Sequence, residues 1–332
     1  MIMRLKLLSR KDVQQTVTMS QAIESVKQAF ISLSQGKAIM PLRTQVLVKD
    51  QDGITLFMPA YLPSIASLGA KIVSVFPHNT KHNLPTIHAL VIICDAKTGQ
   101  PAAVMDGTYL TALRTGAASG VATDLLAQKD ARTAAIIGAG IQGRTQLEAL
   151  CCVRKIQKVW IYDKKSNAAE AFAKEMQNRG EPYPSDTVVA HSPSEAVSEA
   201  EVICCATTSS VPVFEDADLK PGTHINGIGS YTPYMQEIPE QTLVRSKVVV
   251  DSLSASLEEA GDLIIPLRKG LINESHIHGE IGQVASGQIP GRESDQEITF
   301  FKSVGVAVQD VAVAELVFRQ AKGLHQGIDF DL

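Results

Sequence analysis

The sequence has few of the features that mark secreted, membrane-spanning or metal-stabilised proteins. Its 332 residues include five cysteines, an odd number, and no two of them form a CxxC pattern. No stretch approaches the roughly 18 uninterrupted apolar residues of a membrane helix. Charges interrupt the opening MIMRLKLLSRKD, so no signal peptide is indicated. We therefore expect a cytoplasmic protein with reduced, buried thiols and no metal site.

A large charge of either sign is also lacking. The chain has 31 Lys and Arg against 35 Asp and Glu, and its net charge is -4. Such a balance gives no electrostatic attraction to nucleic acid or to an anionic membrane, so a small-molecule partner is expected. A chain of 332 residues is too long for one small core, and we expect two domains.

The first part of the chain predicts a helix followed by an antiparallel sheet. Thr18 and Gln21 form a capping box, apolar residues follow at helical spacing, and Gly36 is a natural stop, so a helix is expected over residues 19–35. Extended segments separated by turn residues predict a mostly antiparallel sheet over residues 40–107. From about residue 108 the sequence becomes helical.

The second part alternates short apolar strands with helices, which is typical of a doubly wound parallel sheet. The expected strands are 133–137, 158–162, 187–190, 201–206, 223–228 and 247–251. The last apolar helix, VGVAVQDVAVAELVFRQA, has no predicted strand after it, and we expect it to return to the first domain. The predicted fold class is α/β.

The hexapeptide GAGIQG supplies Gly138, Gly140 and Gly143 at GxGxxG spacing, after a predicted strand and before a predicted helix. This arrangement allows a tight turn and brings backbone N–H groups and a helix N-terminus to a pyrophosphate. The next strand ends in Asp163, where a carboxylate accepts hydrogen bonds from ribose hydroxyls. Asp163 favours NAD(H), although Lys164 and its neighbour Lys165 could offset its repulsion of the 2′-phosphate of NADP(H).

Three cations near the start of the chain lie among apolar or small residues: Arg43, Lys71 and Arg114. Buried cations without partners are costly, so a converging set usually holds an anion. A small-molecule carboxylate suits such a set. Taken singly, each residue fits an internal salt bridge equally well, and spacing alone does not show that the three meet.

The chain resembles the ornithine cyclodeaminase and mu-crystallin family over nearly its whole length. The matching segments are MPLRTQ, LGAKIVSVFPHN, VMDGTYLTALRTGAASGVAT, IIGAGIQGRTQ, INGIGSYTPYMQEI, EEAGDLIIPL and KSVGVAVQDVA. The resemblance implies a Rossmann domain over residues 121–304. It also implies an α+β substrate-binding and dimerisation domain that combines residues 1–120 with 305–332, and therefore a homodimer.

The resemblance also turns the three cations into one expected site that holds the substrate carboxylate beside the nicotinamide. The residues expected to bind substrate are Arg43, Lys71, His78, Arg114, Tyr231 and Gly305. Those expected to bind the cofactor are Thr115, Gly138, Gly140, Ile141, Gln142, Gly143, Asp163, Lys164, Thr207, Ser303 and Val304. Arg43, Lys71, Arg114 and Tyr231 are the candidates for catalytic residues.

One departure from the family pattern decides the expected reaction. The cyclodeaminases carry an aspartate as the third residue of the motif that here reads GSYTP, where this chain has Tyr231. A tyrosine with a pKa near 10 is a poor general base at neutral pH. The segment GSYTPYMQE instead resembles the branch that reduces Δ1-pyrroline-2-carboxylate and Δ1-piperideine-2-carboxylate to L-proline and L-pipecolate. A closed ketimine ring has no ammonia to expel, so no carboxylate base is required.

Two other functions stay open. The first is a cyclodeaminase or other amino-acid dehydrogenase whose base is supplied by Glu237, His78 or Asp310. The second is a mu-crystallin-like protein that binds nucleotide and ligand without turnover, which the three retained cations argue against. His78 fits a surface turn as well as a pocket, and Asp310, in an apolar helix, is expected to cap or to pair with a buried cation. Asp262, with its two acidic neighbours, is expected on a solvated face.

Overall fold

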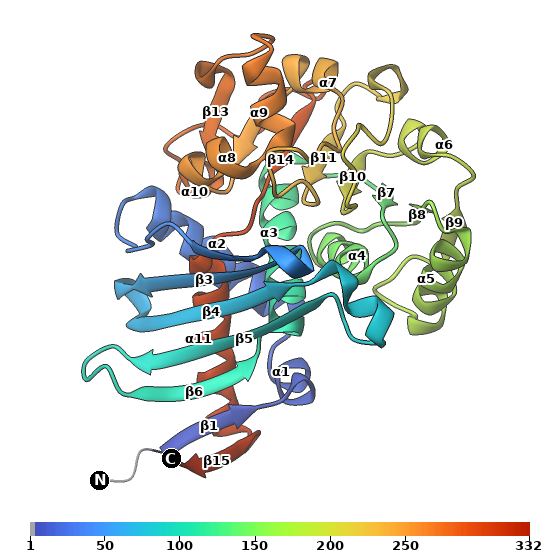
Figure 1. The fold of residues 1–332 in the computed structure, drawn as a ribbon. Coiled ribbons are helices and arrows are strands. Elements are labelled where there is room, and N and C mark those ends of the chain that lie inside the picture. Colours follow the sequence, from blue (N-terminus) through green and yellow to red (C-terminus); the bar gives the residue numbers. More distant parts are fainter. Residues whose placement is uncertain (1–3) are drawn as a thin grey trace. The chain divides into compact units, whose positions relative to one another are not determined.

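The computed structural model describes residues 4–332, which form two compact units. Of the described residues, the first unit combines 4–114 with 306–332, and the second comprises 115–305. The helix α3 (Gly107–Leu126) begins in the first unit and continues into the second. Figure 1 shows the elements of both units along the chain.

The first unit contains a seven-stranded sheet with the order β15-β1-β6-β5-β4-β3-β2. Neighbours from β2 to β6 are antiparallel, as the sequence predicts, whereas β1 pairs with β6 in parallel. The strands are β1 (Arg4–Leu8), β2 (Thr44–Val48), β3 (Gly53–Leu62), β4 (Ser67–Val75), β5 (Ile87–Asp95), β6 (Pro101–Asp106) and β15 (Ile328–Asp331). The prediction that no strand follows the last helix is wrong, because β15 adds to the sheet beside β1.

Besides the start of α3, the described part of the first unit contains the helices α1 (Arg10–Thr16), α2 (Met19–Ser34) and α11 (Ala307–Gly323). The predicted capping box of Thr18 and Gln21 opens α2. Helix α11 packs against β3, β4 and β5, and α2 packs against α11. Along β4, buried residues alternate with half-buried ones, and the hydroxyl of Ser67 donates to the backbone oxygen of Val311 in α11. The buried face of the sheet is therefore the one that α11 covers.

The second unit is built on an eight-stranded sheet whose paired neighbours are all parallel, in the order β13-β12-β14-β11-β10-β7-β8-β9. Six of its strands correspond to predicted ones: β7 (Thr133–Ile137), β8 (Lys158–Tyr162), β9 (Asp186–Val189), β10 (Val202–Cys205), β11 (His224–Gly227) and β12 (Lys247–Val250). Two further strands, β13 (Ile277–Glu280) and β14 (Thr299–Lys302), were not predicted from the sequence. The doubly wound α/β class is confirmed.

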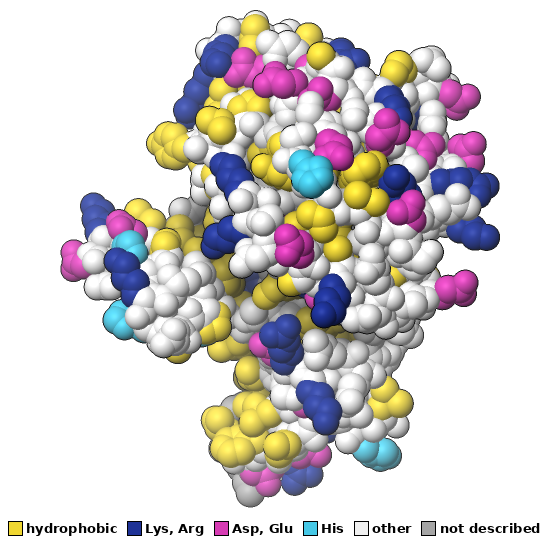
Figure 2. Space-filling view, turned by 90° about the vertical axis from the view of Figure 1, so that its right-hand side faces the viewer, with side chains coloured by type: hydrophobic (Ala, Val, Ile, Leu, Met, Phe, Trp, Pro, Cys, Tyr) yellow, Lys and Arg dark blue, Asp and Glu magenta, His cyan; other side chains and the backbone are white. Residues whose placement is uncertain are grey.

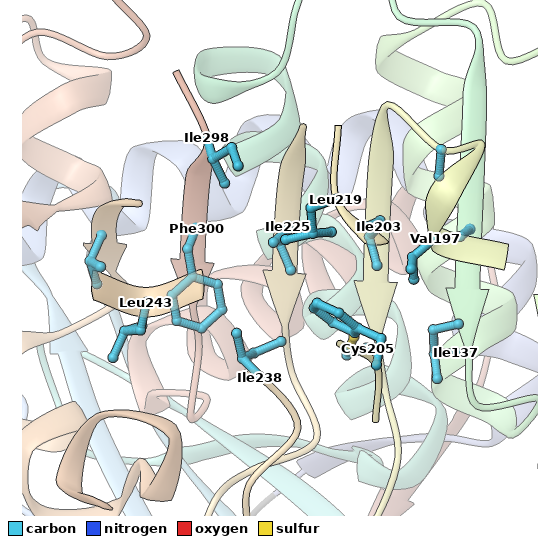
Figure 3. Close-up of a cluster of buried hydrophobic side chains, with 14 of the residues drawn as sticks. Ile137, Val197, Ile203, Cys205, Leu219, Ile225, Ile238, Leu243, Ile298 and Phe300 are labelled. Atoms are coloured by element: carbon cyan, nitrogen blue, oxygen red, sulfur yellow. The ribbon is translucent and has the colours of Figure 1, made fainter. Parts of the chain in front are cut away.

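Successive residues of the central strands enter different hydrophobic cores on the two faces of the sheet. Ala134 and Ile136 of β7 belong to one core, and Ala135 and Ile137 to the other. Figure 3 shows the second core, in which Phe300 lies near Ile238. The helices of this unit are α4 (Ile141–Val153), α5 (Ser166–Arg179), α6 (Pro193–Ser198), α7 (Glu240–Arg245), α8 (Leu253–Glu259), α9 (Gly261–Arg268) and α10 (Ile281–Ala285).

The face shown in Figure 2 has no large patch of one charge sign, because basic and acidic side chains of the described residues are interspersed on it. Within residues 4–332, no helix combines the length and apolar composition needed to cross a bilayer. All five cysteines are free thiols. The expectation that they are buried holds for Cys204 and Cys205 but is wrong for Cys152, which is exposed.

Candidate active site

A buried carboxylate brings two of the three predicted cations together in the first unit. Asp310, in the first turn of α11, is 2.8 Å from the ammonium of Lys71 and 2.9 Å from Nε of Arg114. Lys71 comes from the face of β4 that α11 covers, and Arg114 from α3. The predicted pairing of Asp310 with a buried cation is therefore correct. When Lys71 is protonated, two positive charges and one negative charge give this group a net charge that suits one bound carboxylate.

Gln309 completes the support of Arg114, because its Oε1 accepts a hydrogen bond of 2.5 Å from Nη1. With Nε directed to Asp310 and Nη1 to Gln309, the guanidinium has a fixed plane. The remaining N–H groups of the guanidinium lie in that same plane and point in set directions. A guanidinium fixed in this way is suited to bidentate binding of a carboxylate.

The pKa of Lys71 is lowered from its usual 10.5 to about 7, mainly by burial and also by the positive charges of Arg114 and Arg43. The charge of Asp310 and its hydrogen bond act in the opposite direction. Since the folded-state value lies below the unfolded one, the folded chain holds this proton less tightly, and stability from this group rises with pH between about 7 and 10.5. The ammonium is therefore easily lost near neutral pH.

The other predicted substrate residues of the first unit lie differently. Arg43 is half-buried directly before β2, and its charge is close enough to lower the pKa of Lys71. His78 lies in a short 3-10 helix (Pro77–His82), and its side chain is 44% exposed beside Asp52, 3.0 Å away. The structure thus associates Arg43 with the Lys71 group, whereas His78 is found in a surface turn.

The glycine loop of the second unit has the geometry that a pyrophosphate site requires. Gly138 has a φ of +107°, and a Cβ there would lie 2.6 Å from the backbone oxygen of Ala206. A Cβ at Gly143 would lie 2.2 Å from the backbone oxygen of Gly138, whereas a Cβ at Gly140 would meet no atom within 4 Å. Gly140 is the N-cap of α4, and no side chain caps that helix. The N-terminus of α4 therefore has open space beside it, where an anion can bind the backbone N–H groups of its first turn, which include those of Ile141 and Gln142.

Asp163 follows β8 and connects the adjacent turn to the glycine loop. One carboxylate oxygen accepts from the backbone N–H of Ala139 at 2.8 Å, and the other accepts from that of Lys165 at 2.9 Å. The side chain of Lys164, which lies between Asp163 and Lys165 in the sequence, is exposed. Each carboxylate oxygen keeps accepting capacity for a ribose hydroxyl.

Further acidic residues shape the loops at the carboxyl end of the parallel sheet. Asp251, just after β12, accepts hydrogen bonds from the hydroxyl of Ser303 and from the N–H groups of Val304 and Gly305. The segment 303–305, in which Ser303 and Val304 are predicted to bind cofactor and Gly305 to bind substrate, is therefore fixed by a buried carboxylate that was not predicted from the sequence. The only sequence signal was its place at the end of an apolar strand.

Asp262 contradicts the expectation of a solvated acidic face. It is 1% exposed and pairs with the buried ammonium of Lys302 at 3.0 Å. It also accepts from the N–H groups of Glu237 and Ile238. The expectation was wrong because the LEEAGDL pattern does not reveal the buried lysine of β14, which is 40 residues away in sequence.

The remaining predicted residues belong to the second unit. Thr207 donates both its N–H and its hydroxyl to Glu237, at 2.6 and 2.8 Å. Thr115 is buried in α3, and Tyr231 is 38% exposed in the loop after β11. Glu237, an alternative general base in the sequence analysis, is fully buried and already accepts several hydrogen bonds. That bonding favours a structural use of its carboxylate over proton abstraction.

The profile of the ornithine cyclodeaminase/mu-crystallin family matches residues 3–324. The chain belongs to this family. A Δ1-pyrroline-2-carboxylate reductase of Bacillus cereus is 42% identical over 97% of this chain and 99% of its own length. The family predicted from the sequence segments is therefore confirmed.

Two solved structures extend the similarity to the fold. The Δ1-pyrroline-2-carboxylate reductase of Thermococcus litoralis, in complex with NADH and L-proline, is 43% identical, with a TM-score of 0.94 over 98% of this chain and 100% of that one. An archaeal alanine dehydrogenase dimer with bound NAD is 38% identical, with a TM-score of 0.92 over 99% of each chain. The first of these structures thus contains NADH and the second contains NAD.

Proposed function

We propose that the protein reduces Δ1-pyrroline-2-carboxylate to L-proline with NADH, and that it acts on the six-membered Δ1-piperideine-2-carboxylate by the same chemistry. The buried group of Lys71, Arg114 and Asp310 carries the proposal, because with Lys71 protonated it offers one net positive charge to a substrate with one carboxylate. The high similarity to a reductase that binds NADH and L-proline supports the same choice.

The first unit is proposed to bind the substrate through its carboxylate. Arg114 supplies a guanidinium whose plane Asp310 and Gln309 fix, and Lys71 supplies a buried ammonium. Each charged hydrogen bond to the carboxylate is worth on the order of 1.5 to 3 kcal/mol. These contacts orient the ring so that C2 can take a hydride at near-attack distance.

The second unit is proposed to hold the dinucleotide. The glycine loop and the first turn of α4 face the pyrophosphate, and Asp163 binds the adenosine ribose. When bound, NADH supplies the hydride. The ring nitrogen of the substrate takes a proton, and no ammonia leaves, so the absence of a carboxylate at Tyr231 does not obstruct the reaction. Tyr231 is proposed as a wall or hydrogen-bond donor of the pocket.

The decisive experiment follows the loss of NADH absorbance with Δ1-pyrroline-2-carboxylate as substrate. Parallel reactions contain pyruvate with ammonia, and L-ornithine with NAD+. Rapid oxidation of NADH by the ketimine alone supports the proposal. Faster turnover of pyruvate with ammonia would assign an alanine dehydrogenase, and ammonia from ornithine would assign a cyclodeaminase.

Replacement of Asp163 by serine is expected to change the choice of cofactor. The substitution removes the carboxylate that binds the ribose hydroxyls and repels a 2′-phosphate, while Lys164 remains beside the site. We expect the Kd of NADH to rise about tenfold and that of NADPH to fall. Fluorescence titration with both nucleotides measures this. An unchanged ratio of the two affinities would contradict the assignment of Asp163.

The outer face of the first sheet supports a homodimer. The register places Phe57, Ile72 and Leu90 side by side on the face opposite Lys71. Phe57 and Leu90 are 40% and 37% exposed. Apolar rows of this kind are typical of an interface between subunits, and the alanine dehydrogenase relative is a dimer.

The substitution Leu90→Glu is expected to convert the dimer to a monomer, because it places a charge within this apolar row. Light scattering after size-exclusion chromatography measures the mass. Val244→Glu, at a 45% exposed apolar residue of α7, is the control and should leave the mass unchanged. A monomeric wild type, or a dimeric Leu90→Glu variant, would exclude this interface.

A further inference from the structure

Glu237 is a buried acid that the proposed reaction does not use, and its carboxylate accepts hydrogen bonds from two separate loops. Oε1 accepts from the N–H and the hydroxyl of Thr207, just after β10. Oε2 accepts from the N–H groups of Gly229 and Ser230, just after β11, at 2.6 and 3.2 Å. One side chain therefore holds the ends of two neighbouring parallel strands.

The backbone of Glu237 is itself fixed. Its N–H donates to Asp262 at 2.7 Å, and its carbonyl accepts from the N–H of Val213 at 2.8 Å. The next residue, Ile238, is 1% exposed within the hydrophobic core of Figure 3. The carboxylate is thus presented by a rigid segment, and its position determines where the two loops lie.

The two loops lie where the nicotinamide half of a bound dinucleotide is expected. In the order β8-β7-β10-β11, Asp163 follows β8 and the glycine loop follows β7. A dinucleotide with its adenosine at β8 and its pyrophosphate at β7 extends toward the ends of β10 and β11. Contact between the loops is close, because a Cβ at Gly138 would lie 3.3 Å from Cγ2 of Thr207, and one at Gly229 would lie 2.0 Å from the backbone oxygen of Thr207.

We infer that Glu237 is a positioning residue, whose carboxylate fixes the loops after β10 and β11 and thereby shapes the nicotinamide end of the cofactor site and the loop of Tyr231. The inference rests on the proposed function. All the donors directed at this carboxylate come from Thr207, Gly229 and Ser230. If Glu237 were protonated, its O–H would point at one of these donors, and the hydrogen bond that holds that donor's loop would be lost.

Titration of Glu237 provides a readout that a purely structural role lacks. Its pKa is raised to about 7, mainly by burial and also by the charge of Asp262 in α9, while Lys302 in β14 and the hydrogen bonds of Thr207 oppose the rise. The thiol of Cys205 in β10 also faces it. Because the folded-state pKa is above the ordinary 4.5, the stability from this group is complete below pH 4.5 and is lost as pH rises through about 7. A loss of activity on acidification therefore cannot come from unfolding by this group.

The test compares Glu237→Gln with Glu201→Gln. Glu201 is a matched control because it also accepts two backbone N–H groups and a hydroxyl, from Arg132 and Thr133, but at the start of β7. The Kd of NADH is measured by quenching of the single tryptophan, Trp160, and kcat and KM are measured with the ketimine over about pH 6 to 9.

We expect Glu237→Gln to raise the Kd of NADH and to lower kcat, each about tenfold or more, and to flatten the acid limb of the pH profile. Glu201→Gln should match the wild type in all three measurements. Wild-type values for Glu237→Gln, or equal losses in both variants, would overturn the inference. If Glu237→Gln fails to fold, the pH dependence of the Kd of NADH is measured for the wild type instead. A Kd that rises as the pH falls below about 7 supports the inference, and a Kd that does not change with pH overturns it.

NADH binding also separates this inference from the proposed function. Quenching of Trp160 requires no ketimine. A wild type that binds NADH but does not reduce the ketimine would exclude the proposed reaction, while weaker NADH binding by Glu237→Gln alone would still support the positioning role.

Discussion

Replacement of Arg114 by methionine is expected to lower kcat/KM for the ketimine by roughly a hundredfold to ten-thousandfold, which corresponds to the loss of two charged hydrogen bonds of about 1.5 to 3 kcal/mol each. Methionine keeps an apolar stem of similar length but offers no donor to a carboxylate. The expected loss appears in single-turnover and steady-state kinetics, with NADH affinity unchanged, because the nucleotide residues belong to the second unit.

Loss of a buried arginine also destabilises a protein, and this effect requires a control. Arg154→Met is suitable, since Arg154 is 7% exposed and donates to the backbone oxygens of Gln128, Thr123 and Ala127 in the second unit. Both variants should lose thermal stability, whereas only Arg114→Met should lose ketimine turnover. Normal kcat/KM in Arg114→Met would show that the carboxylate binds elsewhere.

Removal of Arg114 has a second expected consequence, at Lys71. The charge of Arg114 lowers the pKa of the lysine, so its loss should raise that pKa. The residual activity of Arg114→Met should therefore persist to higher pH than the wild-type activity. A pH profile of KM records the shift.

Features that depend on local pattern could be predicted from the sequence. The capping box of α2 and the strands β7 and β8 have the predicted residues, because apolar period and turn chemistry act over a few neighbours. β14 could not be found in this way. It pairs between β11 and β12, although both precede it in the chain, so its four residues depend on distant partners.

The candidate site shows the same limit. Apolar surroundings indicated that Lys71 and Arg114 are unusual cations, and the family resemblance indicated that they act together. Their meeting depends on Asp310, which is 196 residues from Arg114. Glu237 was weighed as a base because the sequence gives its chemistry but not its partners. The partners, four donors from two loops, instead indicate that the carboxylate organises structure.

The substitution Asp310→Asn is expected to raise KM for the ketimine at least about tenfold near pH 7.5, and to do so in a pH-dependent way. Asp310 is the group that raises the pKa of Lys71 against burial and the repulsion of Arg114. Without its charge, that pKa falls below about 7, so the protonated fraction of the lysine at about pH 7.5, already the minor one in the wild type, becomes much smaller. A neutral amine binds a carboxylate weakly, so KM increases.

The direction in which KM of Asp310→Asn changes with pH distinguishes this effect from a general loss of stability. Acidification restores the ammonium of Lys71, so lowering the pH should bring KM of Asp310→Asn back toward the wild-type value. Glu315→Gln is the control on the same helix, because Glu315 is 9% exposed and pairs with Arg319. This control should lose stability without any shift of the profile. If Asp310→Asn instead raised KM equally at every pH, the ammonium of Lys71 would not be what binds the substrate carboxylate, and Asp310 would act on Arg114 alone.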